Sequence, residues 1–183
     1  RDRAMEAAPV GELAPHSDTV YVSVVDRQGN ACSFINSLFQ GFGTGLVVPG
    51  TGVALQNRGF SFSLDPDHPN CLEPRKRPFH TLIPGMATRD GELWLCYGVM
   101  GAIQQAQGHL QVVVNMVDFG LSPQAALDAP RFSVRPGEGV AIEDHVAEET
   151  VRELERRGQP LMVRPPSTAL FGGGQVIERD AET

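Results

Sequence analysis

Apolar side chains that alternate along one short segment constrain the fold of this chain more than any other feature. Val20, Val22 and Val24 are each two residues apart, and a period of two is typical of a β-strand. The next residues, Asp26–Asn30, have the composition of a tight turn, and residues 31–38 form a second strand-like segment. The sequence therefore predicts an antiparallel hairpin.

Other strands and helices follow this hairpin. Segments with the composition of strands lie at 53–56, 81–88, 93–97, 161–164 and 175–178. Helical patterns cover 102–119, a segment from Ser122-Pro123 to just before Pro130, and 147–157. In the first helix, Leu110, Val113, Val114 and Val117 recur at helical spacing and are expected to face a core. Strands followed by helices predict a layered α+β fold rather than a doubly wound parallel sheet.

Length and charge exclude several kinds of partner. The 183 residues fit one domain. A net charge of -7, with 15 dispersed Lys and Arg, argues against a nucleic-acid partner. No apolar stretch is long enough to cross a bilayer, and the residues at the amino end lack the apolar core of a secretory signal, so no membrane partner is expected.

The cysteines indicate neither a disulfide framework nor a metal centre. Cys32, Cys71 and Cys96 are odd in number and lack the spacing of a zinc site. Buried or idle thiols are therefore expected, and the sequence predicts neither a bound metal nor a cofactor.

Several motifs, in one order along the chain, carry a family resemblance. They are Asp18–Asp26, Gly29–Ala31, Phe42–Gly45, Arg77–Pro78, Gly98–Gly101, Asp118–Leu121 and Ala129–Phe132. On these residues the chain resembles the small subunit of the γ-glutamyltranspeptidase family, and within it the γ-glutamyltransferase-like and acylase branch. Members are N-terminal-nucleophile hydrolases made as one precursor that cuts itself before a Thr. The resemblance implies part of a four-layer αββα sandwich, with antiparallel sheets flanked by helices.

The resemblance assigns catalytic roles to four residues. Cleavage between Asp18 and Thr19 would free the Thr19 α-amine, which could then accept a proton from the Thr19 hydroxyl as that hydroxyl attacks an amide. Ser37 matches a family Thr whose hydroxyl holds the nucleophile. Gly101 and Ala102 match two glycines whose backbone N–H groups bind the oxyanion, and Ala102 keeps its N–H. In the absence of the resemblance, Thr19 is an ordinary β-branched strand residue.

The substrate pocket departs from the family pattern. Family members hold the α-amine of the γ-glutamyl group with Asn, Gln and Asp, and these positions correspond here to Phe39, Arg58 and Ser61. A guanidinium would repel a buried ammonium, so the amine site is expected to be rebuilt. The paired serines that hold the substrate carboxylate correspond to His80 and Thr81, which can still donate hydrogen bonds.

The resemblance also implies a division of the chain and a partner. Residues 1–18 would end a large-subunit region, and 19–183 would be the catalytic small-subunit domain, expected to be truncated because the usual Ser-Asp-Pro-Arg strand is missing. The expected partner is the large subunit of the same precursor, in a heterodimer or a dimer of heterodimers. A cytoplasmic location is slightly favoured over a periplasmic or secreted one.

The resemblance leaves several functions open. The first is an autoprocessing amide-bond hydrolase or acyltransferase that acts, through an acyl-enzyme on Thr19, on γ-glutamyl amides such as glutathione or on related carboxy-acyl amides. Within the family, the altered pocket favours a glutaryl-type cephalosporin acylase or an oxamate-type amidohydrolase. An alternative of another class is a catalytically weak binding protein or an unprocessed precursor fragment.

Overall fold

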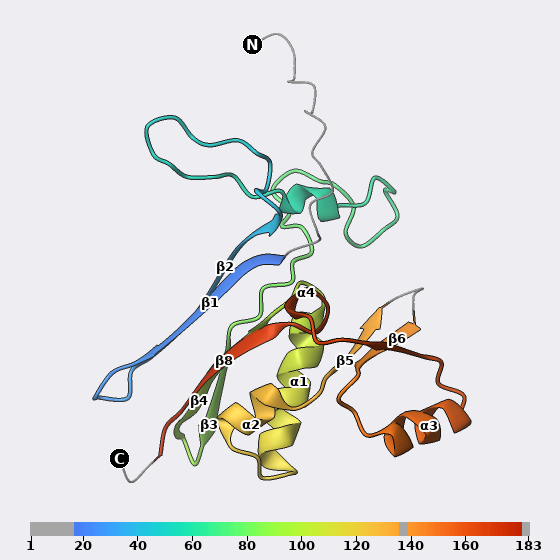
Figure 1. The fold of residues 1–183 in the computed structure, drawn as a ribbon. Helices are drawn as coiled ribbons and strands as arrows, with labels where there is room; N and C mark the ends of the chain where they lie inside the picture. The colour runs from blue at the N-terminus through green and yellow to red at the C-terminus, as the bar shows by residue number, and fades with distance from the viewer. Residues whose placement is uncertain (1–16, 136–138, 181–183) are drawn as a thin grey trace.

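The computed structural model describes residues 17–135 and 139–180, so most of the expected lead-in 1–18 lies outside the described residues. The strands are β1 (Ser17–Val25), β2 (Ala31–Gln40), β3 (Gly85–Arg89), β4 (Glu92–Met100), β5 (Phe132–Arg135), β6 (Gly139–Glu143), β7 (Leu161–Arg164) and β8 (Gly173–Glu178). The helices are the 3-10 helix η1 (Arg58–Ser61), α1 (Gln104–Val117), α2 (Pro123–Asp128), α3 (Glu148–Arg156) and α4 (Thr168–Phe171). Strands and helices form the expected α+β fold (Figure 1).

The predicted hairpin is confirmed, and its turn explains its register. Strands β1 and β2 pair antiparallel, with Thr19 opposite Ser37. In the turn, the Asp26 carboxylate accepts hydrogen bonds from the N–H groups of Gln28 and Asn30, each at 2.9 Å. Gly29 adopts φ +83°, which glycine adopts without steric cost. The first strand begins at Ser17, two residues earlier than expected.

The ladder of this hairpin is irregular at the predicted cleavage point. Ser17 pairs with Gln40, whereas Thr19 pairs with Ser37, so β2 contains one extra residue there. Phe39 lies in this bulge at φ +81°, in a region that non-glycine residues rarely adopt. Bulges of this kind redirect a side chain, often beside an active site.

The hairpin stacks on a second sheet of strand order β3-β4-β8, in which both pairs are antiparallel. A Cβ built on Gly98 of β4 would lie only 2.5 Å from Cδ2 of Tyr21, so the tyrosine ring lies directly against the backbone of β4. The Tyr21 hydroxyl is also 2.7 Å from the Ser33 hydroxyl and 3.6 Å from the Cys96 thiol. Burial raises the pKa of Tyr21, so its hydroxyl stays protonated.

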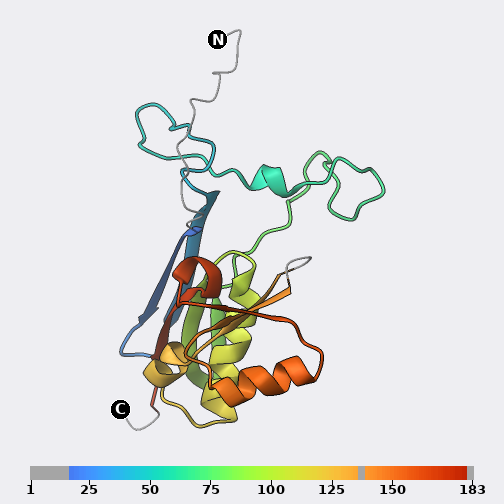
Figure 2. The same cartoon turned by 45° about the vertical axis from the view of Figure 1, so that its right-hand side comes forward.

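Helices α1 and α2 cover the other face of the second sheet. A Cβ on Gly108 of α1 would lie 2.6 Å from Cγ1 of Val99, the residue that follows Gly98 and so points to the opposite face. The main core lies in this layer and consists of Leu95, Val99, Val112, Met116 and Ala126. Hairpin, sheet and helices are thus three successive layers of an αββα sandwich (Figures 1 and 2).

The predicted face of α1 is partly wrong. Leu110 and Val117 are exposed, and the buried face instead carries Gln104, Gln105, Gly108, His109, Val112 and Met116. Two further glutamines cover the edge of β5: Gln107 bonds both the N–H and C=O of Val134, and Gln111 bonds both those of Phe132. Amide side chains can imitate a neighbouring strand in this way because they carry both a donor and an acceptor.

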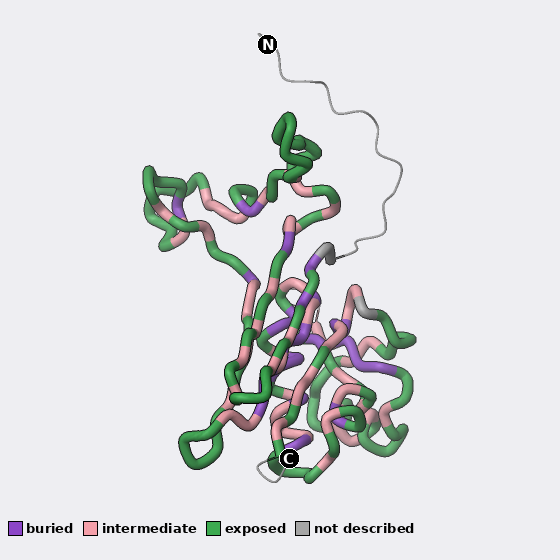
Figure 3. The backbone as a smooth tube through the Cα atoms, turned by 90° about the vertical axis from the view of Figure 1, so that its left-hand side faces the viewer, coloured by how far each residue is buried: buried purple, intermediate pink, exposed green. Residues whose placement is uncertain are grey.

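Two predicted segments differ from the observed ones. Within the described residues, 53–56 contains no strand and makes only an isolated bridge between Val47 and Ala54. The strand expected at 81–88 begins only at Gly85. Instead, the segment between β2 and β3 extends away from the sheets as long loops (Figures 1 and 2), and much of it is exposed (Figure 3).

The remaining third sheet has the strand order β5-β6-β7, and β6 and β7 are parallel, so not every pair is antiparallel as expected. Helices α2 and α3 and strand β7 match their predictions, and Ser122 caps α2 by accepting a hydrogen bond from Ala125 N–H at 3.3 Å. All three cysteines are free thiols. Within the described segments, no helix has the length and apolar character needed to span a bilayer.

Candidate active site

Thr19 and Ser37 form a buried hydroxyl pair across the hairpin. Thr19 is 8% exposed and Ser37 is 7% exposed. The Thr19 hydroxyl donates to Ser37 Oγ at 3.0 Å, and the backbone N–H of Phe39 donates to the same oxygen at 2.9 Å. Ser37 therefore fixes the rotamer of Thr19 and at the same time anchors the bulge.

The direction of β1 brings Thr19 to the end of β4 that leads into Gly101 and Ala102. The turn of the hairpin lies near the start of β4. A Cβ on Gly29 would lie 3.2 Å from the Arg179 side chain, and Arg179 directly follows β8, whose last residues pair with the first half of β4. Since Tyr21 packs over Gly98, the residues before Tyr21 lie toward Met100. Thr19 shares the inward face of Tyr21, and the start of β1 and the amino end of α1 lie at the same end of the molecule (Figures 1 and 2).

Gly101 and Ala102 form a tight turn before the helix rather than its first residues. Their φ angles are +129° and +53°, and a right-handed helix cannot include such residues, so α1 begins at Gln104 instead of the predicted 102. The turn closes with a hydrogen bond from Gln104 N–H to the Gly101 carbonyl at 2.9 Å. A Cβ on Gly101 would also lie 3.0 Å from the Cα of Gly172, and this close approach adds to the φ of +129° in favouring glycine there.

Sequence reasoning missed two residues that support this turn. Gly172 has φ +78°, and a Cβ on it would lie 2.3 Å from the carbonyl oxygen of Met100. His109 of α1 accepts the Val99 N–H at Nε2, at 2.9 Å. Burial lowers the pKa of His109 to about 4, so the imidazole is neutral and can act as this acceptor. The run of glycines at 172–174 could have indicated Gly172, whereas no sequence pattern indicated His109.

Three of the five predicted pocket residues lie together. Arg58 is 6% exposed, and its guanidinium carbon lies 5.1 Å from the centre of the Phe39 ring. Arg58 Nη1 donates to the hydroxyl of buried Thr81 at 3.4 Å. Because Phe39 also bonds to Ser37, these contacts connect the pocket to the hydroxyl pair.

The other two predicted pocket residues make different interactions. The backbone carbonyl of Ser61 accepts a hydrogen bond from the Asn70 amide at 2.6 Å. His80 is exposed, and its Nδ1 accepts the Leu82 N–H at 3.2 Å. Neither side chain hydrogen-bonds to Arg58, Phe39 or Thr81 in the described part of the chain.

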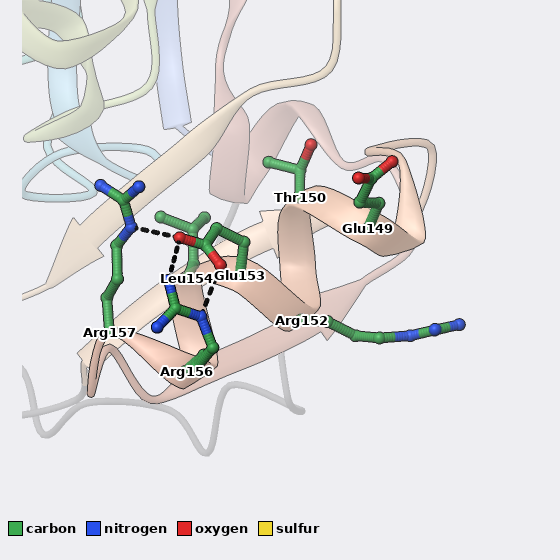
Figure 4. Close-up of a pocket in the computed structure, with 7 residues that line it drawn as sticks. All are labelled: Glu149, Thr150, Arg152, Glu153, Leu154, Arg156 and Arg157. Atoms are coloured by element: carbon green, nitrogen blue, oxygen red, sulfur yellow. Dashed lines mark hydrogen bonds and ion pairs between the residues drawn. The ribbon is translucent and has the colours of Figure 1, made fainter.

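One other depression occurs in the described part of the chain, and its lining does not suit a catalytic site. A shallow depression over α3 is lined by a charged surface in which Glu153 pairs with Arg156 and Arg157, each at 2.7 Å (Figure 4). These pairs are solvent-exposed and satisfy one another, as on many helix surfaces. In residues 17–135 and 139–180, no group of three or more His, Cys, Asp or Glu side chains is arranged to hold a metal ion.

Comparison with known proteins gives the family. The family model described as Gamma-glutamyltranspeptidase matches residues 2–183. The Glutathione hydrolase-like YwrD proenzyme of Bacillus subtilis is 39% identical over 182 residues, which are 97% of this chain and 34% of that protein. The Oxamate amidohydrolase proenzyme of Klebsiella pneumoniae is 34% identical over 178 residues, 94% of this chain and 34% of that protein.

Among solved structures, the cephalosporin acylase from Bacillus halodurans superimposes with a TM-score of 0.85 at 48% identity, over 96% of this chain and 33% of that one. The chain thus spans about one third of the length of these relatives. These matches run along nearly the whole chain, at 34% to 48% identity, and the solved structure has the same fold. The chain therefore belongs to the γ-glutamyltranspeptidase family.

Proposed function

We propose that this chain is the catalytic small-subunit part of an autoprocessing amide-bond hydrolase or acyltransferase, with Thr19 as its nucleophile. The observation that carries the proposal is the buried hydrogen bond from the Thr19 hydroxyl to Ser37, at the end of β1 that lies toward the Gly101–Ala102 turn. Both curated relatives named above are proenzymes, in agreement with a cut in the precursor.

Processing would begin at the irregular part of the hairpin. The bond between residues 18 and 19 lies where the register shifts by one residue. In the proposed reaction, the Thr19 oxygen attacks the carbonyl of residue 18, and the peptide becomes an ester with a free Thr19 α-amine. Water then cleaves the ester, and two chains result. Residues 1–18 would end the large subunit, and 19–183 would belong to the small one.

Catalysis would use both groups of the new terminal residue. An α-amine titrates near 8, so a neutral amine is available to take the proton of the Thr19 hydroxyl during attack on a substrate amide. The tetrahedral oxyanion would be bound by the N–H groups of Gly101 and Ala102. As the intermediate collapses, the leaving amine takes the proton and an acyl-ester remains on Thr19. Water would resolve this ester in hydrolysis, and an acceptor amine would resolve it in transfer.

The large subunit of the same precursor is the proposed partner. The outer face of the β1-β2 hairpin is apolar and about half exposed; it consists mainly of Val20, Val22, Val24 and Phe34. The loops between β2 and β3 also expose large apolar side chains, among them Phe42, Phe60 and Leu64. Apolar surface of this extent is rare on a free domain. A fourth layer from the large subunit would cover it, as the sandwich requires.

The proposed substrates are γ-glutamyl amides or related carboxy-acyl amides. The names of the relatives support this range, since they include a glutathione hydrolase-like protein, an oxamate amidohydrolase and a cephalosporin acylase. Arg58 argues against a substrate ammonium in its vicinity, because the guanidinium is buried and positively charged.

Intact-mass measurement on the full-length precursor tests the proposal. We expect the wild-type protein to divide between residues 18 and 19, Thr19→Ala to stay whole, and Thr19→Ser to divide. Processed wild-type protein should then release p-nitroaniline from a carboxy-acyl anilide with an initial burst. Division of the Thr19→Ala precursor at the same bond would disprove the role of Thr19.

A further inference from the structure

A buried cation with an unused donor is connected to the proposed nucleophile through Phe39 and Ser37. The Arg58 side chain is almost wholly enclosed, and its Nη2 atom has no hydrogen-bond partner in the described residues. Its Nη1 atom bonds to the neutral hydroxyl of Thr81, and no carboxylate pairs with the guanidinium in the described part of the chain.

An enclosed guanidinium requires an anion. Burial lowers the pKa of Arg58, but an arginine remains protonated in proteins at neutral pH, so the positive charge stays. A buried charge without a counter-ion is strongly unfavourable, and a buried donor without an acceptor adds to the cost. The face of the Phe39 ring, 5.1 Å away, offsets only part of it.

The contacts around Arg58 form two adjacent donors. Since the Thr81 hydroxyl accepts from Nη1, its own hydrogen is available to another acceptor. Nη2 supplies a second, charged donor. A planar guanidinium with a neighbouring hydroxyl suits the two oxygens of one carboxylate.

We propose that Arg58, assisted by Thr81, binds the terminal carboxylate of a five-carbon dicarboxylic acyl group and so makes the enzyme selective for glutaryl-type amides. This inference rests on the proposed function, because it takes the acyl carbonyl to lie at Thr19. It names the acyl group that the same site accepts.

The distance along β2 between Ser37 and Phe39 limits the length of acyl chain that the site accepts. The attacked carbonyl lies beside Ser37, which holds Thr19, and the carboxylate lies beside Phe39, over which Arg58 stacks. Two residues of a regular strand span about 7 Å, and this is an upper bound here because Phe39 lies in the bulge. A glutaryl group, with three methylenes between its carbonyl and carboxylate, extends over such a distance together with its hydrogen bonds. An oxamyl group, in which the two carbons are directly bonded, is too short.

Two anilides of equal length separate charge recognition from packing. On the processed full-length protein, glutaryl-p-nitroanilide carries the terminal carboxylate and valeryl-p-nitroanilide has the same carbon count without it. We expect Arg58→Gln to lower kcat/KM for the glutaryl compound by about 10- to 100-fold, mainly through KM, because a charge-assisted hydrogen bond is lost. Turnover of the valeryl compound should change by less than about twofold.

A second arginine provides the matched control. Arg89 also stacks on an aromatic ring, with its guanidinium carbon 4.0 Å from the centre of Trp94, but it is exposed and lies on β3. Arg89→Gln should leave both anilides unchanged. Arg58→Lys keeps the charge without the planar fork, so its kcat/KM for the glutaryl compound should lie between those of wild type and Arg58→Gln. It replaces Arg58→Gln if that variant does not fold.

Calorimetric binding of free glutarate separates this inference from the proposed function. We expect the processed protein to bind glutarate, Arg58→Gln to bind it at least about tenfold more weakly, and oxamate to bind more weakly than glutarate. If the protein turns over neither anilide but binds glutarate through Arg58, the proposed function is refuted and this inference is supported. Equal loss on both anilides, unchanged glutarate affinity in Arg58→Gln, or oxamate binding as tight as glutarate would overturn it.

Discussion

Replacement of Ser37 by alanine tests the hydroxyl pair most directly. The Ser37 oxygen accepts from the Thr19 hydroxyl at 3.0 Å and from Phe39 N–H at 2.9 Å. Loss of the first bond frees the rotamer of Thr19, the proposed nucleophile. At about 1 to 2 kcal/mol, this loss should slow processing and turnover by about 5- to 30-fold. Loss of the second leaves a backbone donor unpaired and should lower the free energy of unfolding by about 1 to 3 kcal/mol.

The assay is a time course of intact mass on the full-length precursor, together with urea unfolding. Ser33→Ala is the matched control, because Ser33 lies on the same face of β2 and its hydroxyl bonds to Tyr21 at 2.7 Å. The control should lose about 1 kcal/mol of stability and process at the wild-type rate. Ser37→Thr keeps the hydroxyl and should recover most of the rate. If Ser33→Ala slows processing as much as Ser37→Ala, the effect comes from the hairpin as a whole and our reasoning fails.

Other perturbations test the layers around the site. The pKa of His109 in the folded protein is about 4, below its ordinary 6.5, so as the pH falls the unfolded chain takes up the proton first. The free energy of unfolding should therefore be constant with respect to His109 above about pH 6.5 and decrease toward pH 4, by up to about 3 kcal/mol. Urea unfolding at a series of pH values measures this decrease. His109→Gln should flatten this decline, and an unchanged slope would contradict it. Gly98→Ala places a Cβ 2.5 Å from Tyr21 and should cost about 1 to 3 kcal/mol of unfolding free energy. Gly59→Ala is the control, because no atom lies within 4 Å of its new Cβ, and it should change the free energy of unfolding by less than about 0.5 kcal/mol. Equal losses in the two variants would refute the packing of Tyr21 against Gly98. Ala102→Gly keeps the backbone N–H and suits the observed φ of +53°, so kcat should stay within about twofold; a large loss would show that the methyl group, rather than the N–H, matters.

Local patterns predicted the elements whose residues interact mainly with near neighbours. The hairpin turn depends on Asp26 bonding to residues two and four positions away, and α2 depends on Ser122 and Pro123 at its start. Strands β5 and β6 were not predicted. The edge of β5 is bonded by Gln107 and Gln111 of α1, and β6 pairs with the distant strand β7, so neither depends on neighbouring residues alone. The predicted core face of α1 failed because polar side chains on its buried face have partners far along the chain, such as Gln104 with the Phe132 carbonyl.

Candidate site residues could be proposed from motifs, but their relations could not. The order of motifs suggested Thr19, Ser37 and the glycine turn, because such chemistry depends on particular residue types. Whether Arg58 was an exposed loop residue or an enclosed cation could not be read from the residues around it. Its enclosure results from the bulge that turns Phe39 toward it and from the buried Thr81, 23 positions away.

The sequence alone determined the strand period, the turn and cap residues, and the family motifs, since these depend on side-chain type and spacing within a few residues. Only the tertiary structure decided which faces became the core and which residues meet Thr19. Those outcomes come from the stacking of the hairpin over β4, with Tyr21 against Gly98. The contacts join residues more than 70 positions apart, and their free energy depends on how whole layers fit together.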